Sequence, residues 1–338
     1  MGCHFAPTGI AAYSAIAVDD PGRRRAVVAG TWSDGLKIGL TLPMAQPDNG
    51  AMPRYADIRE AALCAERDGF DSVWVYDHLL FRWENRPTYG IWEAWSVLSA
   101  LAEATSRVEV GALVMCTAFR NPGLLAKMAD AVDEISNGRL ILGLGAGWHK
   151  PEFVAFGYPF DHLVSRFEES LRIIAPLLRT GAVDFRGTYE SAIDCVSLPR
   201  GPRPDGPPIL VGASSPRMLR LTAEMADAWN TCWLARADEL PERAAKLHAA
   251  CAEVRRDPAT LEVTVGQMVT FPGLDQEQDP AGGLEKFTFA DAQDLAGEFA
   301  KFAAQGVGHL MVWPTPRVPA CVEQVSAALR MYRAGAAR

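Results

Sequence analysis

The chain has 338 residues, of which 49% are hydrophobic and 22% are charged, and its formal net charge is -8. This composition excludes disorder of the whole chain and allows a core large enough for one barrel or two smaller domains. The acidic balance argues against a nucleic-acid or anionic-membrane partner, because either would favour a basic face. The seven cysteines form no Cys-x-x-Cys pair, which indicates neither a zinc site nor a disulfide framework and fits a reducing cytoplasm.

Residues 1–35 are predicted to form a loose, flexible N-terminal extension. Their mildly apolar stretch, 9–18, follows no positive charge and is too short to span a bilayer. No other apolar run is long enough for a membrane helix, so we expect a soluble protein with no membrane partner. The remainder, 36–338, is predicted to be a single domain.

From residue 36 onward, a strand, a polar or Gly/Pro corner and an amphipathic helix alternate eight times. The expected strands are 36–42, 72–76, 108–115, 139–144, 208–211, 228–232, 262–270 and 309–313. The expected helices are 55–68, 92–105, 122–136, 161–179, 216–225, 238–255, 290–304 and 319–332. The pattern predicts an α/β fold, a (β/α)8 TIM barrel; a doubly wound open sheet has the same local alternation, and the count of eight favours the barrel.

Two stretches do not fit the repeat. Residues 183–196 are predicted to form a small hairpin inserted between the fourth and fifth strands, and 272–284 a mobile loop before the seventh helix. Insertions of this kind usually cover the active-site face of a barrel or bridge subunits.

The second strand ends in Asp77, a candidate for cofactor binding, and His78. Active sites of TIM barrels lie where strands end, and histidine is the side chain suited to exchange a proton near neutral pH. His78 is therefore a candidate catalytic residue, with a purely structural, hydrogen-bonded histidine as the alternative.

Two further strand ends supply candidates for ligand binding. The third strand is followed by Met115, Cys116 and Thr117, and the fourth by Gly145, Ala146, Gly147, Trp148 and His149. Alternate glycines let a flat ligand approach the backbone, although their spacing differs from the Gly-x-Gly-x-x-Gly of Rossmann folds. Because no basic residue adjoins Cys116, we expect this thiol to be buried rather than nucleophilic.

The fifth strand is followed by Gly212, Ala213, Ser214 and Ser215, just before Pro216. A serine that caps the next helix explains this segment without a ligand. The free N–H groups of a helix N-terminus and two hydroxyls also suit a cofactor phosphate, which we favour because barrels often bind phosphate at such a loop. The six histidines have no ligand spacing, so no metal site is expected.

Several separated motifs occur in the order found in one known family. They are Gly-Phe-Asp-Ser-Val-Trp-Val-Tyr-Asp-His at 69–78, Arg-Asn-Pro-Gly-Leu-Leu-Ala-Lys at 120–127, Gly-Arg-Leu-Ile-Leu-Gly-Leu-Gly-Ala-Gly-Trp at 138–148, Phe-Gly-Tyr-Pro-Phe at 156–160, Pro-Ile-Leu-Val-Gly at 208–212 and Ala-Asp-Ala-Trp-Asn at 226–230. Together they resemble the luciferase-like oxidoreductase family over about 36–313, and Asp-His after strand two resembles its deazaflavin-dependent branch. The resemblance implies a (β/α)8 barrel that holds FMN or the 5-deazaflavin coenzyme F420 at its C-terminal face.

The resemblance also implies roles for individual residues. The position matching His78 is the proposed proton donor or acceptor. A non-prolyl cis peptide that backs the cofactor ring maps to about Met115–Cys116, residues 145–149 line the other side of the ring, and 212–215 hold the phosphate. This chain departs from relatives in having His149 where Asn or Tyr is frequent, and in a phosphate loop that is poorer in glycine.

The expected function is hydride transfer between F420 and a small organic substrate. One alternative is an FMN-dependent monooxygenase on the same barrel, because reduced FMN can activate oxygen whereas a deazaflavin barely reacts with it. Another alternative is a barrel that binds flavin without turnover, and the absence of ligand clusters disfavours a metal-dependent hydrolase. Relatives are often dimers, so a homodimer is a further expectation.

Overall fold

The computed structural model describes residues 35–47, 50–274 and 284–336. All of them belong to one compact unit, Trp32–Arg338. The predicted extension over 1–35 lies outside the described residues except for Gly35, and so does the part of the predicted loop between 275 and 283. Within the described residues, no helix is both long and apolar enough to cross a membrane.

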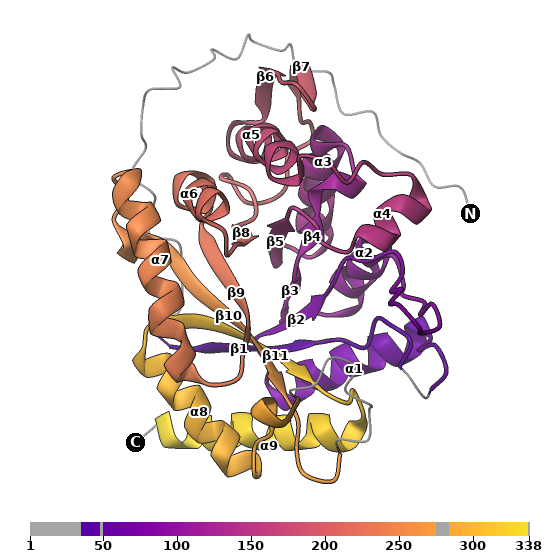
Figure 1. The fold of residues 1–338 in the computed structure, drawn as a ribbon, viewed down its shortest axis with the longest axis vertical. Coiled ribbons are helices and arrows are strands. Elements are labelled where there is room, and N and C mark those ends of the chain that lie inside the picture. The colour runs from indigo at the N-terminus through magenta and orange to yellow at the C-terminus, as the bar shows by residue number, and fades with distance from the viewer. Residues whose placement is uncertain (1–34, 48–49, 275–283, 337–338) are drawn as a thin grey trace, which may run out of the picture. The chain divides into compact units, whose positions relative to one another are not determined.

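Eight parallel strands close into a barrel, as predicted (Figure 1). Each strand pairs with the next along the chain, and the last pairs with the first through contacts such as Lys37 with His309. This closure excludes the doubly wound open sheet. The barrel strands are β1 (Lys37–Thr41), β2 (Ser72–Val75), β3 (Glu109–Ala112), β5 (Leu140–Gly145), β8 (Ile209–Gly212), β9 (Ala228–Leu234), β10 (Glu262–Val269) and β11 (Val307–Pro314).

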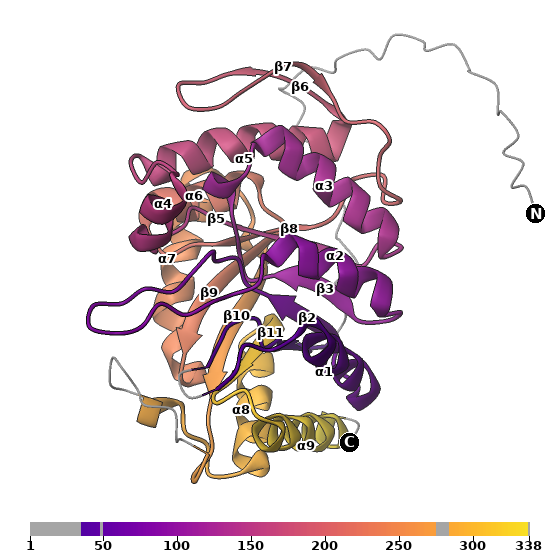
Figure 2. The same ribbon diagram turned by 90° about the vertical axis from the view of Figure 1, so that its right-hand side faces the viewer.

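Helices surround the barrel in both views (Figures 1 and 2). The helices of the described part are α1 (Tyr55–Asp68), α2 (Ala94–Ala104), α3 (Pro122–Ile135), α4 (Lys150–Phe156), α5 (Leu163–Thr180), α6 (Pro216–Met225), α7 (Leu240–Glu253), α8 (Ala292–Ala304) and α9 (Pro319–Ala336). Short 3-10 turns occupy Thr117–Phe119, Ala237–Glu239, Pro258–Thr260 and Leu284–Phe287. The predicted insertion is confirmed as an antiparallel hairpin of β6 (Ala182–Arg186) and β7 (Ser191–Val196), which lies against α5 in Figures 1 and 2.

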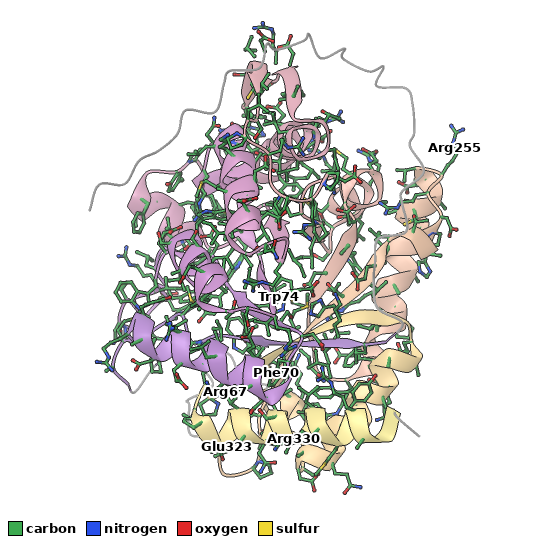
Figure 3. All side chains as sticks on the ribbon, turned by 180° about the vertical axis from the view of Figure 1, so that it is seen from behind. Arg67, Phe70, Trp74, Arg255, Glu323 and Arg330 are labelled. Atoms are coloured by element: carbon green, nitrogen blue, oxygen red, sulfur yellow. The ribbon has the colours of Figure 1, made fainter. Side chains whose placement is uncertain are left out.

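The barrel interior is filled by side chains from different strands. Trp74 is fully buried there, and Figure 3 shows it among the strands, whereas the labelled Glu323 and Arg330 lie on an outer helix. Glycines on the neighbouring strands make room for its indole, because a Cβ at Gly39 or Gly111 would come within 2.5 or 2.4 Å of Trp74 atoms. The interior is therefore a packed core, as in other TIM barrels.

Ionisable groups gather at the amino end of the barrel. Lys37, Glu109 and Glu262 each open a strand, and Nζ of Lys37 lies 2.9 Å from Oε1 of Glu109. Burial raises the pKa of Glu262 to about 8 and lowers the pKa of His309 to about 3. His309 is held through Nε2, which lies 2.7 Å from Oγ of Ser72. This end of the barrel is opposite the strand ends at which the candidate site residues lie.

Candidate active site

Asp77 follows β2, and its buried carboxylate is bound by protein groups. The guanidinium of Arg120 donates to both carboxylate oxygens, at 2.6 and 3.1 Å, and the backbone N–H of Cys116 donates at 2.9 Å. Arg120 also donates to Glu93, whose carboxylate caps α2 by accepting from the N–H groups of Trp95 and Ser96. Asp77 thus connects the ends of β2, β4 (Met115–Cys116) and the start of α2.

His78 is held by a second buried carboxylate, that of Glu152. Nδ1 of His78 lies 2.9 Å from Oε1 of Glu152, and the N–H of Leu79 donates to Oε2 at 2.7 Å. The side chain of Glu152 is 2% exposed and that of His78 is 14% exposed. Because a carboxylate accepts, Nδ1 carries a proton and donates it. No described residue bonds to Nε2, so this nitrogen is the one that can exchange a proton with a ligand.

Glu152 is a site residue that the sequence analysis missed. It lies on α4, a seven-residue helix that was assigned to the loop after the fourth strand. So short a helix has too few residues for an amphipathic period. Its terminal signals were nevertheless present, with Pro151 in the first turn and Gly157 in the left-handed conformation at φ 77° after the last residue.

An aromatic cluster surrounds His78. Its ring centroid lies 4.5 Å from that of Phe81 and 5.5 Å from that of Trp148. The rings of Trp83 and Trp148 lie 5.8 Å apart with an interplanar angle of 30°. The structure thus brings the predicted Trp148 to His78, and adds Phe81 and Trp83 from the loop after β2.

His149 links two of the strand-end loops. Its Nε2 accepts a hydrogen bond from the backbone N–H of Arg82 at 3.1 Å, and its ring lies 4.7 Å from that of Trp83. Burial lowers its pKa below the usual histidine value, which keeps the ring neutral and Nε2 able to accept. His149 therefore fixes the loop after β2 against the loop after β5.

The third strand end differs from the prediction. The strand expected over 108–115 leaves the ladder after Ala112 and resumes as β4, and the non-prolyl cis peptide is Leu113–Val114 rather than Met115–Cys116. Met115 packs in the main core, and Cys116 packs against aromatic side chains beneath the site, so both are buried. Val114 is the partly exposed residue at this strand end.

The glycines of β5 and β8 accommodate this change of path. A Cβ at Gly145 would lie 2.5 Å from Cγ2 of Val114, and one at Gly143 would lie 1.9 Å from the carbonyl oxygen of Ala112. A Cβ at Gly212 would lie 3.4 Å from Cγ1 of Val114. Gly145 and Gly212 thus leave space for the side chain of Val114, and Gly143 lets the carbonyl of Ala112 come close to β5.

Three other predicted residues of these loops have structural contacts. Gly147 has a φ of +83°, and a Cβ there would lie 2.7 Å from Sγ of Cys116, so a close turn requires glycine. The hydroxyl of Thr117 donates to the carbonyl of Gly145 at 3.4 Å. Ala146, between the two glycines, is half-buried and packs against the main core.

The segment after β8 leads into the N-terminus of α6. Ala213 is buried, and its carbonyl accepts from Nε1 of Trp229 at 2.8 Å. Ser214 and Ser215 are exposed, and Ser215 occupies the N-cap position without a side-chain cap hydrogen bond. Their hydroxyls and the first N–H groups of α6 are thus available, which fits the predicted phosphate position.

The parallel strands bring all these loops to one end of the barrel. His78, Val114, Trp148 and Ser214 come from or follow β2, β3, β5 and β8, whose carboxyl ends meet at one rim. In the described part of the chain, no three His, Cys, Asp or Glu side chains are arranged to hold a metal ion. The rim combines a histidine held through Nδ1, an aromatic surface and two exposed serines at a helix N-terminus.

Comparison with known proteins places this arrangement in a family. A family profile described as luciferase-like monooxygenase matches residues 36–279. An F420-dependent glucose-6-phosphate dehydrogenase of Amycolatopsis mediterranei is 33% identical over 51% of this chain and 52% of its own length, so the chain spans about half of that relative. The pyrimidine monooxygenase RutA of Rhizobium rhizogenes is 29% identical over 77% of this chain and 73% of its own.

A solved structure shares the barrel. An F420-dependent secondary alcohol dehydrogenase, in complex with an F420-acetone adduct, matches with a TM-score of 0.74 at 20% identity and covers 88% of this chain and 99% of that one. A likeness at this identity establishes the fold. With the profile covering most of the barrel, the chain belongs to the luciferase-like monooxygenase family.

Proposed function

We propose that this protein is an oxidoreductase that transfers a hydride between coenzyme F420 and a small organic substrate, with His78 as proton donor or acceptor. The observation that carries the proposal is the His78–Glu152 pair, which fixes the imidazole through Nδ1 and leaves Nε2 for a ligand. The F420-dependent dehydrogenase of Amycolatopsis mediterranei supports the choice of cofactor.

The residues at the rim fit such a cofactor. Val114, which covers Gly145, would face the ring, and Ser214 and Ser215 with the N-terminus of α6 would hold a phosphate. When bound, F420 supplies a ring carbon that donates or accepts hydride and reacts little with oxygen. His78 takes the proton from a substrate heteroatom as hydride leaves the adjoining carbon, or returns it in the reverse direction, while Glu152 holds the imidazole in one tautomer.

A second candidate is an FMN-dependent monooxygenase. It is favoured by the match to RutA, which covers 77% of this chain against 51% for the F420-dependent relative. In this reading the same rim binds FMN and the reaction consumes oxygen.

The decisive experiment is equilibrium binding of the chain to F420 and, separately, to FMN, followed by fluorescence anisotropy. We expect tight binding of F420 and none of FMN at the same concentration. His78→Ala should retain the affinity for F420 within about threefold and lower the turnover rate by about 10²- to 10⁴-fold, the usual contribution of a general acid or base. Preferential binding of FMN, together with oxygen uptake, would replace the first proposal with the second.

A further inference from the structure

Trp83 and Trp148 form an exposed pair of rings beside His78, which we call the tryptophan wall. Trp83 is 42% exposed and Trp148 is 59% exposed, and their centroids are 5.8 Å apart. The edge-on contact of His78 with Trp148, at 5.5 Å and 81°, makes the wall continuous with the proposed proton-exchanging group.

Contacts with neighbouring rings fix the position of Trp83 in the wall. Trp83 contacts the ring of His149 at 4.7 Å and that of Phe81 at 6.4 Å, stacked on the latter. His149 is itself buried and bonded to the N–H of Arg82. Large apolar rings that remain exposed at a site and are fixed by their neighbours are typical of surfaces that bind a ligand.

The distance between the rings of Trp83 and Trp148 determines which ligand shape fits the wall. Two rings that hold a third between them must be about 7 Å apart, twice a stacking distance of about 3.5 Å. At 5.8 Å, Trp83 and Trp148 already contact each other, so they cannot form a slot and instead offer one aromatic surface. A flat ring matches such a surface, whereas a puckered aliphatic ring keeps only part of the contact.

We propose that the substrate carries a planar aromatic ring that packs on the tryptophan wall, with the reacting alcohol or carbonyl carbon attached directly to that ring. This inference rests on the proposed function and adds the substrate class. It is supported by the contact between Trp148 and His78, because a ring packed on the wall lies beside the imidazole, whose Nδ1 is already bound by Glu152.

Two probes with the same reactive group and the same number of carbon atoms test the ring. We would titrate the F420-loaded chain calorimetrically with benzyl alcohol and with cyclohexylmethanol. We expect benzyl alcohol to bind about 3- to 10-fold more tightly, the size of the preference for an aromatic pair. Trp83→Leu and Trp148→Leu should each reduce that ratio, and the double variant should bring it to about one.

Trp92→Leu is the matched control. Trp92 is also an exposed tryptophan at the end of the same loop, 44% exposed, but its Nε1 donates to the carbonyl of Pro53, and it has no ring contact with the wall. The ratio should be unchanged in this variant. Equal affinities for the two probes in the unaltered chain, or a ratio that survives the double variant, would overturn the proposal.

Separate measurements test whether the tryptophan wall binds the cofactor or a second copy of the chain instead of the substrate. If the double variant loses F420 affinity by anisotropy, the wall binds the cofactor and the substrate proposal fails. If the variant changes the oligomeric state in sedimentation while the ratio persists, the wall is an interface with a second copy and the proposal also fails. If the unaltered chain does not bind F420 at all, the proposed function fails, and the same titration on the FMN-loaded chain still decides whether the wall selects flat rings.

Discussion

Glu152 and His78 are 74 positions apart in the chain, yet Oε1 of Glu152 lies 2.9 Å from Nδ1 of His78. The other oxygen of Glu152 accepts from the N–H of Leu79, the residue that follows His78. One buried carboxylate thus holds both the imidazole and the backbone next to it, so the direction of the imidazole depends on Glu152.

Glu152→Gln should lower turnover by about 10²-fold, the cost of a small misplacement of a reacting group. The amide can accept only through its oxygen, so it cannot accept from both the imidazole and the N–H of Leu79 in the present geometry. Affinity for F420 should stay within about threefold, which steady-state kinetics and anisotropy would establish together. Glu103→Gln, on the exposed surface of α2, is the control, and a Glu152→Gln variant with the unaltered rate would show that the contact does not serve the reaction.

Arg120→Ala should lower the free energy of unfolding by about 3–5 kcal/mol. The change removes the partner of the buried Asp77 and leaves a carboxylate that the surrounding protein cannot solvate. Urea denaturation followed by circular dichroism measures the loss. The exposed pair of Arg67 and Glu60 provides the comparison, because Arg67→Ala should cost no more than about 1 kcal/mol. Similar losses of unfolding free energy in both variants would mean that the buried pair of Arg120 and Asp77 contributes no more to stability than the exposed pair.

Gly145→Ala should cost about 1–3 kcal/mol and weaken cofactor binding. Its Cβ would come within 2.5 Å of Val114, which must then move at the rim. Adding Val114→Ala should restore part of the stability, and a double-mutant cycle from urea denaturation measures this coupling. Gly297→Ala, in an exposed position of α8 with open space around it, should instead stabilise by about 0.5–1 kcal/mol. If the effects of Gly145→Ala and Val114→Ala on the free energy of unfolding were strictly additive, the two positions would not be in contact.

His309 should make the protein sensitive to acid. Burial lowers its pKa to about 3, while the unfolded chain has the ordinary value of 6.5. Between these values the unfolded state binds one more proton, so the free energy of unfolding falls by up to about 1.4 kcal/mol for each unit of decreasing pH. His309→Gln should flatten the profile between pH 6.5 and 3 in urea denaturation, whereas His248→Gln, at an exposed position, should leave it unchanged.

The ionisation of Glu262 should have the opposite effect, because it lowers the free energy of unfolding as the pH rises. Burial raises its pKa to about 8, from an ordinary 4.5, and its Oε2 has no hydrogen-bond partner among the described residues. Between pH 4.5 and 8 the folded state holds the extra proton, so this contribution to stability is lost as the pH rises. Glu262→Gln should therefore raise the free energy of unfolding at pH 8 by about 1–3 kcal/mol and leave it nearly unchanged at pH 4.5. An equal effect at both values would show that Glu262 does not titrate in this range.

The sequence predicted the barrel because its signals are local. Alternating strands and helices, and helix ends such as Asp68-Gly69 with Gly69 in the left-handed conformation, are each visible within a few residues. The same locality placed His78, Trp148 and Ser214 at strand ends, and parallel pairing then brought them to one rim.

The features that the sequence did not predict depend on contacts between distant segments. Glu152 meets His78 only after the seven-residue helix α4 has formed and packed, and Val114 has space at the rim only because Gly145 on β5 has no side chain. The position of Asp77 at a strand end predicts contact with a cofactor, but Arg120, 43 positions away, binds its carboxylate. No local pattern encodes these pairings.

The parallel course of the strands also has a practical consequence. Glu262 and His309, whose pKa values are shifted by burial, lie at the opposite end of the barrel from His78 and the tryptophan wall. Replacing residues at the amino end offers directed evolution a way to raise heat resistance without altering catalysis, and randomising the loops around Trp83 and Trp148 offers a way to change selectivity on an unchanged scaffold.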